Sequence, residues 1–313
     1  MEASVLDNSH TTGYPHSILL NPSAKINLSL VVFGKRDDGL HELHTIMASV
    51  ALHDDLHLQL AATPGIKLQC TGLPCPAGPD NLVYKAARLL ADHAVVTAAL
   101  EINLHKRIPA GAGLGGGSSD AAACLMGLNR LWKLNIPITQ LAGLAAKLGS
   151  DVPFFLHRPV AVCTGRGELV EPIPHRCQRS LLLILPRIHV STAEVYQNYY
   201  HDESRNEDRM RRVRYFLRTG DLDGLVIQGI NSLSHTCMKL FEPLRELRSR
   251  IEAMGIGPLH MSGSGSCLFA TAKSDKQTNS WAQQLQEHDL AQVMAVNFNE
   301  QPESFLEVPY ANI

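Results

Sequence analysis

The chain has 313 residues, 45% of them hydrophobic, which is enough to bury a sizeable core in one large unit or in two domains. Its formal charge of -2 gives no overall attraction to nucleic acid, so no nucleic-acid partner is predicted. No uninterrupted apolar run approaches the roughly 18 residues of a membrane span, so no membrane association is expected. The first 24 residues contain neither Lys nor Arg, which argues against a signal or transit peptide and favours a cytoplasmic protein.

The first structured segment is predicted to follow a loose tail over residues 1–17. From Ser23 to Leu30, alternation places Ile26 and Leu28 on one face of a strand and Lys25 and Asn27 on the other. A lysine in a strand is ordinarily a solvated edge residue. Because Asn27 points the same way, the pair instead favours a polar face that holds a substrate hydroxyl.

A glycine-rich segment between a strand-like run (Leu100 to Lys106) and a helical pattern is the most informative part of the chain. It contains five glycines and two serines. Such a segment exposes backbone N–H groups, tolerates positive φ and leads into a helix N-terminus, all of which suit a bound phosphate. The predicted phosphate-binding residues are Pro109, Ala110, Gly111, Ala112, Gly113, Leu114, Gly115, Gly116, Gly117, Ser118 and Ser119.

Three alternatives to a phosphate loop can be compared with this segment. A flexible linker would not sit between a strand and an apolar helix. The dinucleotide-binding fingerprint needs an acidic residue about 20 positions further on, and none occurs between Asp120 and Asp151. A Walker A loop needs a lysine after its last glycine, where Ser118 stands. Any lysine at the phosphates must therefore come from elsewhere in the chain.

Two helices are predicted behind the loop. Ser118, Ser119 and Asp120 are good N-cap or first-turn residues for the first, whose apolar stripe extends to Trp132. Thr139 is predicted to cap the second, which ends near Gly149.

Asp151 stands directly before a short element, Val152 to Leu156. Its structural role would be to cap that element. A carboxylate held there, two elements after a phosphate loop, can also face the transferred phosphoryl group or the attacking hydroxyl. The sequence leaves both roles open.

The second half carries fewer chemical signals. A domain boundary is predicted near residues 170–178, before a buried strand at Leu181 to Leu185. Six arginines between 205 and 218 indicate either a solvated helix face or a rim for a phosphate-bearing ligand or acidic partner. A further helix is predicted over 240–254. Ser262 to Gly265 reads as a tight turn before a strand, or as a second loop at the site.

No resident metal site is predicted. The seven cysteines are scattered without a CxxC pair. His53 and His57 are four apart in a strand-like pattern, which separates their rings too far for one ion. His41 and His44 do not form the HExxH pattern of a metalloprotease.

Taken together, these segments resemble the GHMP small-molecule kinases. The resemblance is carried by Pro22-Ser23-Ala24-Lys25-Ile26-Asn27, by Pro109 to Ala122 and by Met261-Ser262-Gly263-Ser264-Gly265-Ser266. It implies an α+β, two-lobed fold. The N-terminal lobe, residues 18–174, would resemble ribosomal protein S5 domain 2 and bind ATP. The C-terminal lobe, residues 175–313, would be ferredoxin-like and close over the substrate.

One segment, Gly34 to Met47, resembles the branch of these kinases that acts on a cytidine diphosphate-linked methylerythritol. The implied catalytic pair is Lys25 and Asp151, and Asp80-Asn81-Leu82 resembles the segment near the adenine, which adds Asn81 and Leu82 to the ATP site. The implied substrate contacts are Asn27, Leu40, His41, Thr192, Tyr196, Ser262 and Gly263. Where the family usually has tyrosine this chain has Leu40, which removes an aromatic contact to the nucleobase.

The expected reaction is transfer of the γ-phosphate of ATP, with Mg²⁺ brought by the nucleotide, to the 2-hydroxyl of that small-molecule substrate in non-mevalonate isoprenoid biosynthesis. Asp151 would be a general base or an orienting charge. A kinase of the homoserine or mevalonate type and a catalytically silent nucleotide-binding regulator remain alternatives. The oligomeric state is left open.

Overall fold

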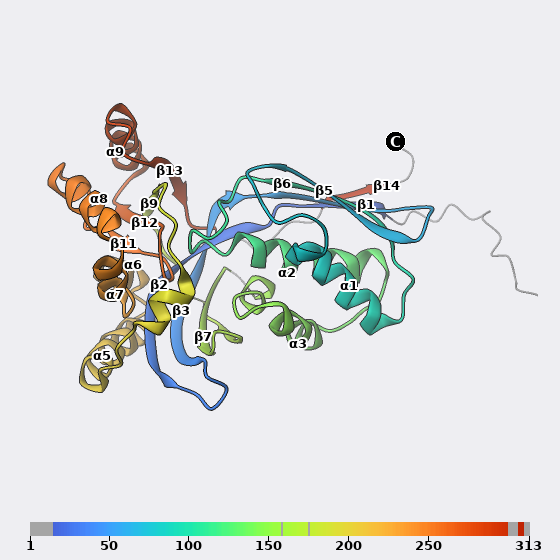
Figure 1. The fold of residues 1–313 in the computed structure, drawn as a ribbon, viewed down its shortest axis with the longest axis horizontal. Helices are drawn as coiled ribbons and strands as arrows, with labels where there is room; N and C mark the ends of the chain where they lie inside the picture. Colours follow the sequence, from blue (N-terminus) through green and yellow to red (C-terminus); the bar gives the residue numbers. More distant parts are fainter. Residues whose placement is uncertain (1–14, 158, 175, 300–305, 310–313) are drawn as a thin grey trace, which may run out of the picture.

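The computed structural model describes residues 15–157, 159–174, 176–299 and 306–309. It has two lobes side by side, with the long strands β2 (Ser23–Lys35) and β3 (His41–His53) running where the lobes meet (Figure 1). The buried part of β2 is residues 23–32 and that of β3 is residues 45–50, because both faces of the sheet are covered along these stretches.

The N-terminal lobe contains two five-stranded sheets. The first has the order β14-β1-β4-β6-β5, and only its β5–β6 pair is parallel. Its strands are β14 (Leu306–Pro309), β1 (Pro15–Leu20), β4 (Asp55–Leu60), β6 (Ala99–Lys106) and β5 (Gly65–Gly72). The second has the order β10-β2-β3-β7-β8, and its remaining strands are β10 (Ile230–Asn231), β7 (Val160–Gly165) and β8 (Leu169–Pro172).

Three helices cover one face of the first sheet (Figure 1). They are α1 (Leu82–Ala94), α2 (Gly116–Leu131) and α3 (Ile138–Leu148), with short 3-10 turns η1 (Gly78–Asp80) and η2 (Pro153–Leu156) beside them. The apolar stripe predicted for α2 is buried at Ala121, Leu125 and Leu128. This helix lies in the centre of the lobe, so the loop at its start is held on a rigid support.

The C-terminal lobe is a four-stranded antiparallel sheet with the order β11-β12-β9-β13. The strands are β11 (His260–Met261), β12 (Leu268–Ala272), β9 (Ser180–Leu185) and β13 (Gln292–Asn297). Its helices are α4 (Thr192–Gln197), α5 (Glu203–Thr219), α6 (Leu222–Gln228), α7 (Ser234–Leu240), α8 (Glu242–Ala253) and α9 (Asp275–Glu287). The strand predicted at Leu181 to Leu185 is β9, and all of it is buried.

The lobes share a hydrophobic core. One cluster of buried side chains joins Ile26 and Leu114 of the first lobe to Leu181, Leu225 and Phe269 of the second. Two strands also cross between lobes, since β10 pairs with β2, and β14 returns to pair with β1 (Figure 1). The boundary predicted between residues 174 and 175 falls between β8 and β9.

The predicted helix starts agree with the structure only in part. Helix α2 begins at Gly116 with Gly115 at its N-cap, so Ser118 and Ser119 lie in its first turn, Asp120 follows them, and none of the three is the N-cap. The N-cap position needs the left-handed conformation, which Gly115 adopts at φ +70. Glycine adopts this conformation without steric cost, so it takes the N-cap position in place of a serine. Thr139 lies within α3, where Pro137 takes the N-cap position.

Two further predictions differ from the structure only in their bounds. The helix predicted over 240–254 is α8, which begins at Glu242 because Phe241 separates it from α7 and Pro243 favours a new first turn. The tail predicted over residues 1–17 overlaps β1, which starts at Pro15, whereas residues 1–14 lie outside the described residues.

Candidate active site

A cavity of about 640 Å³ lies where the lobes meet. It contains nine of the predicted catalytic, phosphate-binding and substrate-binding residues, namely Lys25, Asn27, Leu40, His41, Gly113, Asp151, Thr192, Tyr196 and Gly263. It also contains Lys35, Ser150, Arg166, Gln197 and Ser264, which the sequence did not single out. The cavity therefore collects side chains from both lobes and from widely separated parts of the sequence.

The polar face of β2 is the centre of this cavity. The Lys25 side chain is buried, and its Nζ donates to Asn27 Oδ1 at 2.8 Å and lies 3.4 Å from Asp151 Oδ2. Asn27 in turn donates from Nδ2 to Thr45 Oγ1 at 2.8 Å, and Thr45 donates to the Ser29 carbonyl at 2.6 Å. A buried ammonium needs such partners, and together they hold Lys25 in one orientation.

Asp151 does not cap the turn that follows it. Val152 precedes η2, and no side chain caps this turn, so the prediction of a capping role was wrong. The Asp151 side chain instead keeps 35% of its surface exposed and lines the cavity opposite Lys25. Its carboxylate is thus available to a ligand hydroxyl while it remains beside an ammonium.

The glycine loop is fixed against β2 and against the second glycine-containing loop. The Lys25 N–H donates to the Leu114 carbonyl at 2.9 Å. The Ser262 hydroxyl donates to the Gly113 carbonyl at 2.9 Å, and a Cβ on Gly113 would lie 2.5 Å from the Ser262 carbonyl oxygen. Gly113 also has φ +78, which side chains rarely adopt. Close approach of the two loops therefore requires glycine here.

The start of α2 presents unpaired backbone N–H groups and a fixed dipole. Ser119 Oγ is buried there and has no hydrogen-bond partner among the described residues. Leu82, predicted to lie near the adenine, approaches this helix, because a Cβ on Gly117 would lie 3.5 Å from its Cδ1. Asn81 caps α1 by accepting from the Val83 N–H at 2.8 Å. Leu82 therefore adjoins the start of α2, Asn81 precedes it as the N-cap of α1, and neither residue lines the 640 Å³ cavity.

Aromatic rings gather at the other end of the cavity. The His41 ring centroid lies 5.4 Å from that of Tyr196 and 6.0 Å from that of Tyr199. Burial, with smaller contributions from Lys35 and His201, lowers the pKa of His41 below its ordinary 6.5, so the imidazole is neutral at pH 7. Leu40 is 45% exposed beside it. Neutral imidazole can donate and accept at once, which suits reading the edge of a base.

A pair of hydroxyl groups also lines the cavity. Thr192 Oγ1 and Ser264 Oγ are 2.8 Å apart, joining the start of α4 to the second glycine-containing loop. Ser262 is fully buried beneath this loop, where it also lies 3.5 Å from Asn27 Oδ1. Of the two residues predicted there, Gly263 lines the cavity and Ser262 supports it.

A buried charged cluster that the sequence analysis missed lies under the start of α2. Lys106 Nζ donates to Asp120 Oδ2 at 2.6 Å and also to Asp54, and all three side chains are at most 3% exposed. Burial raises the pKa of Asp120 to about 8, helped by Asp54 and opposed by Lys106. Although burial opposes it, Asp120 and Asp54 raise the pKa of Lys106. Burial therefore favours the protonated form of Asp120, and the two carboxyl groups favour the charged form of Lys106.

Other missed residues had weak signals or none. Lys106 ends a strand directly before the glycine loop, and that position could have suggested a cation beside the start of α2. Thr45 lies in an apolar strand pattern, so its contact with Asn27 was not visible. Arg166 lines the cavity from the turn after β7. A single arginine in a turn is typical of a solvent-exposed residue, so this position could not be inferred from the sequence.

Known proteins were compared with this chain. Models of the GHMP kinases N terminal domain and the GHMP kinases C terminal domain match residues 81–158 and 222–289. A 4-diphosphocytidyl-2-C-methyl-D-erythritol kinase of Pelotomaculum thermopropionicum is 42% identical over 79% of this chain and 86% of its own length. The chain belongs to the 4-diphosphocytidyl-2-C-methyl-D-erythritol kinase family. A relative of the same name from Shouchella clausii is 38% identical over 82% of this chain and 86% of its own length.

Solved structures agree with membership of the 4-diphosphocytidyl-2-C-methyl-D-erythritol kinase family. The crystal structure of a 4-(cytidine 5'-diphospho)-2C-methyl-D-erythritol kinase matches with a TM-score of 0.73 and 32% identity, covering 90% of this chain and all of that one. A homoserine kinase from Cytophaga hutchinsonii has a TM-score of 0.74 at 17% identity, over 96% of this chain and 100% of its own. The latter likeness shows the fold alone, which confirms the predicted α+β, two-lobed architecture.

Two expectations outside the site can be compared with the structure. Within the described residues, no helix combines the length and apolarity needed to cross a bilayer. The described residues also contain no group of three or more His, Cys, Asp or Glu side chains arranged to hold a metal.

Proposed function

We propose that this kinase transfers the γ-phosphate of ATP to the 2-hydroxyl of 4-diphosphocytidyl-2-C-methyl-D-erythritol, with Lys25 and Asp151 at the reacting groups. One observation carries the assignment of roles. Lys25 Nζ lies 3.4 Å from Asp151 Oδ2 in the wall of a cavity that Gly113 of the glycine loop also lines. An ammonium, a carboxylate and backbone N–H groups around one space are the groups that phosphoryl transfer requires.

Lys25 stabilises the charge that develops on the migrating phosphoryl group. Its Nζ is fixed by Asn27 and, through Asn27, by Thr45. Such preorganisation matters because catalysis of phosphoryl transfer consists mostly of positioning and electrostatic stabilisation. We infer that Asn27 and Thr45 position Lys25 rather than react.

Asp151 accepts a hydrogen bond from the attacking hydroxyl and takes its proton as the new P–O bond forms. Its partly exposed carboxylate faces the cavity, where a substrate alcohol can reach it. The proton thus passes from the substrate oxygen to the carboxylate, and the γ-phosphoryl group passes from ATP to that oxygen, with ADP as the leaving group.

The nucleotide phosphates would bind the N–H groups of the glycine loop and of the first turn of α2. The buried Ser119 hydroxyl in that turn has no hydrogen-bond partner among the described residues, and a phosphate oxygen or its Mg²⁺ would supply one. Mg²⁺ prefers oxygen ligands and keeps several waters, so Ser119 and Asp151 together with the phosphates would hold it. When bound, Mg²⁺ supplies neutralisation of phosphate charge.

The aromatic end of the cavity would bind the cytosine. Neutral His41 would read the edge of the base while Tyr196 covers its face, and the Thr192–Ser264 hydroxyl pair would contact the diphosphate. Leu40 would cover the base as an aliphatic group. A homoserine or mevalonate substrate has no ring for this end of the site.

Asp151→Asn tests the assignment, because it keeps the shape of the side chain and removes its charge. We expect kcat with the cytidyl substrate to fall about 10²–10⁴-fold, with the Kd of ATP retained. A coupled ADP-release assay and equilibrium titration with ATP measure the two quantities. Asp289→Asn, which removes an 87% exposed carboxylate, should leave both unchanged.

Unchanged turnover in Asp151→Asn would remove Asp151 from the mechanism. Assay of the wild type with homoserine and mevalonate beside the cytidyl substrate distinguishes the alternatives. Turnover of homoserine or mevalonate alone would reassign the substrate, and ATP binding without ADP release for every acceptor would indicate a regulator.

A further inference from the structure

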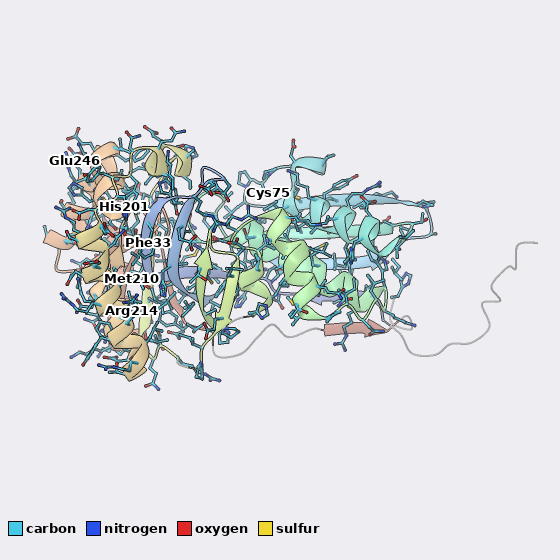
Figure 2. All side chains as sticks on the ribbon, turned by 90° about the horizontal axis from the view of Figure 1, so that it is seen from below. Phe33, Cys75, His201, Met210, Arg214 and Glu246 are labelled. Carbon is cyan, nitrogen blue, oxygen red and sulfur yellow. The ribbon has the colours of Figure 1, made fainter. Side chains whose placement is uncertain are left out.

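A second cavity lies between the start of α5 and α7, outside the proposed active site. Its volume is about 280 Å³, and none of its lining residues lines the first cavity. In Figure 2, His201 and Met210 mark the stretch of chain that contains the start of α5. The lining consists of Asn198, Tyr199, Tyr200, Asp202, Arg205, Arg209, Ser232, His235, Thr236, Lys239 and Leu240.

Two helices each contribute a pair of basic residues one turn apart. Arg205 and Arg209 lie on α5, and His235 and Lys239 lie on α7. Residues four apart share one helix face, so both pairs turn toward the same cavity. Lys239 forms no ion pair with any residue that the structure describes. Its charge is therefore available to a ligand.

The local charge is positive. Among the described lining residues, Asp202 is the only carboxylate. It already accepts from the Arg205 N–H at 3.1 Å as the N-cap of α5, and it pairs with Arg205 Nε at 3.1 Å. Two arginines and a lysine thus face one carboxylate, which leaves an excess of positive charge even when His235 is neutral.

The Arg209 side chain is ordered by a hydrogen bond to Asn206 of the same helix. Its Nη1 donates to Asn206 Oδ1 at 2.8 Å, and the buried Asn206 donates to the Val32 carbonyl at 2.6 Å. A guanidinium has five N–H donors, so further donors remain for an anion. Because the side chain is already ordered, a ligand does not bear the full cost of immobilising it.

We propose that this cavity binds a small molecule through a diphosphate group. The cavity has room for roughly nine waters at about 30 Å³ each, which is sufficient for a diphosphate. Arginine and lysine are the side chains that pair best with phosphate oxygens, and the Ser232 and Thr236 hydroxyls add neutral partners. The six-arginine segment is thus a ligand rim at its N-terminal end rather than a solvated face throughout.

Acetylation of Lys239, followed by peptide mass spectrometry, tests the site without using the kinase reaction. We expect pyrophosphate at ten times its Kd, without Mg²⁺ and with ionic strength held constant by chloride, to slow this acetylation about tenfold. The exposed Lys276 on α9 should react at the same rate throughout. A short-chain alkyl diphosphate run in parallel distinguishes an organic from an inorganic ligand by which of them protects at lower concentration.

Arg205→Gln should weaken the Kd obtained from this protection by about tenfold or more, since it removes a charge-assisted hydrogen bond. The Arg205 side chain is 69% exposed, so the fold should tolerate the change. Arg218→Gln, at the other end of α5 and outside the cavity, is the matched control and should retain wild-type protection. Equal acetylation of Lys239 with and without diphosphate, or equal loss of protection in both variants, would overturn the proposal. Neither result would bear on the kinase activity.

Discussion

Individual side chains in this protein take their roles from their neighbours more than from their own chemistry. Lys25 is buried because Asn27 and Asp151 satisfy its ammonium, and Asn27 is oriented because Thr45 accepts its N–H. His41 is neutral because burial disfavours its charged form. At this scale, predictions concern one proton or one hydrogen bond.

His41→Ala should raise the KM for the cytidyl substrate about tenfold or more and change kcat little, because the lost contact is made equally in the ground and transition states. In the wild type, KM should rise as the pH falls below the ordinary imidazole pKa of 6.5 and through the lowered pKa of His41, where the ring gains a proton and loses its acceptor. Steady-state kinetics at several pH values measure both. The exposed His288→Ala is the control, and an unchanged KM in His41→Ala would remove the ring from the substrate site.

Asp120→Asn should make stability less dependent on pH. The folded-state pKa of about 8 exceeds the ordinary 3.8, so the folded protein retains a proton that the unfolded chain releases. The resulting stabilisation is complete below pH 3.8 and is lost as the pH rises through about 8. Between about pH 6 and about pH 8, we expect the free energy of unfolding to fall by at least about 1 kcal/mol more in the wild type than in the variant.

Urea unfolding at several pH values measures this difference. Asp92→Asn, which changes an exposed carboxylate in the Arg88–Asp92 pair, should keep the wild-type pH dependence. The same pH dependence in Asp120→Asn as in the wild type would show that the buried cluster does not hold the proton.

Among the elements, the two glycine-containing loops depend on each other. The first presents its N–H groups only because the second approaches it closely at Gly113 and Ser262. The Cys267 N–H also donates to the Ala112 carbonyl at 3.1 Å. One loop comes from each lobe, so their contact fixes the phosphate site to the lobe junction.

A comparison of Gly113→Ala with Gly111→Ala separates the effect of a positive φ on stability from the effect of the contact between the two loops. Both glycines have positive φ, +78 and +71, but only at Gly113 would a Cβ meet another backbone. We expect Gly113→Ala to lose about 1–3 kcal/mol more stability than Gly111→Ala, because the second loop must shift. Chemical unfolding of the two variants compares them. Equal losses would mean that the loops do not need to meet this closely.

We expect the whole molecule to unfold as one unit, because both lobes contribute to a single buried cluster around Ile26, Leu181 and Phe269. The crossing strands β10 and β14 strengthen this connection. A two-lobed shape does not therefore imply two independent folding units.

Calorimetry should show one unfolding transition. Phe269→Ala, at a site only 1% exposed, should lower the free energy of unfolding by about 3–5 kcal/mol and shift that single transition to lower temperature. The exposed Tyr200→Ala, at 84% exposure, is the control with little effect. Two separate transitions, with only one of them shifted, would contradict the shared core.

The sequence alone determined those features that depend on neighbouring residues. The glycine loop, the strand face of Lys25 and Asn27 and the buried strand β9 were predicted, because positive φ, side-chain alternation and apolar runs act over a few residues. The family resemblance extended this to the fold, which the comparisons confirm.

Only the tertiary structure decided which groups meet. The Lys25–Asp151 contact, the Thr45 support and the Lys106–Asp120 cluster join residues distant in sequence or hidden in apolar patterns. The N-cap of α2 is Gly115 and not one of the serines after it, because backbone geometry at Gly115 outweighed their capping preference. Distances between side chains and the burial that shifts their pKa are properties of packing, and packing is set by the whole chain.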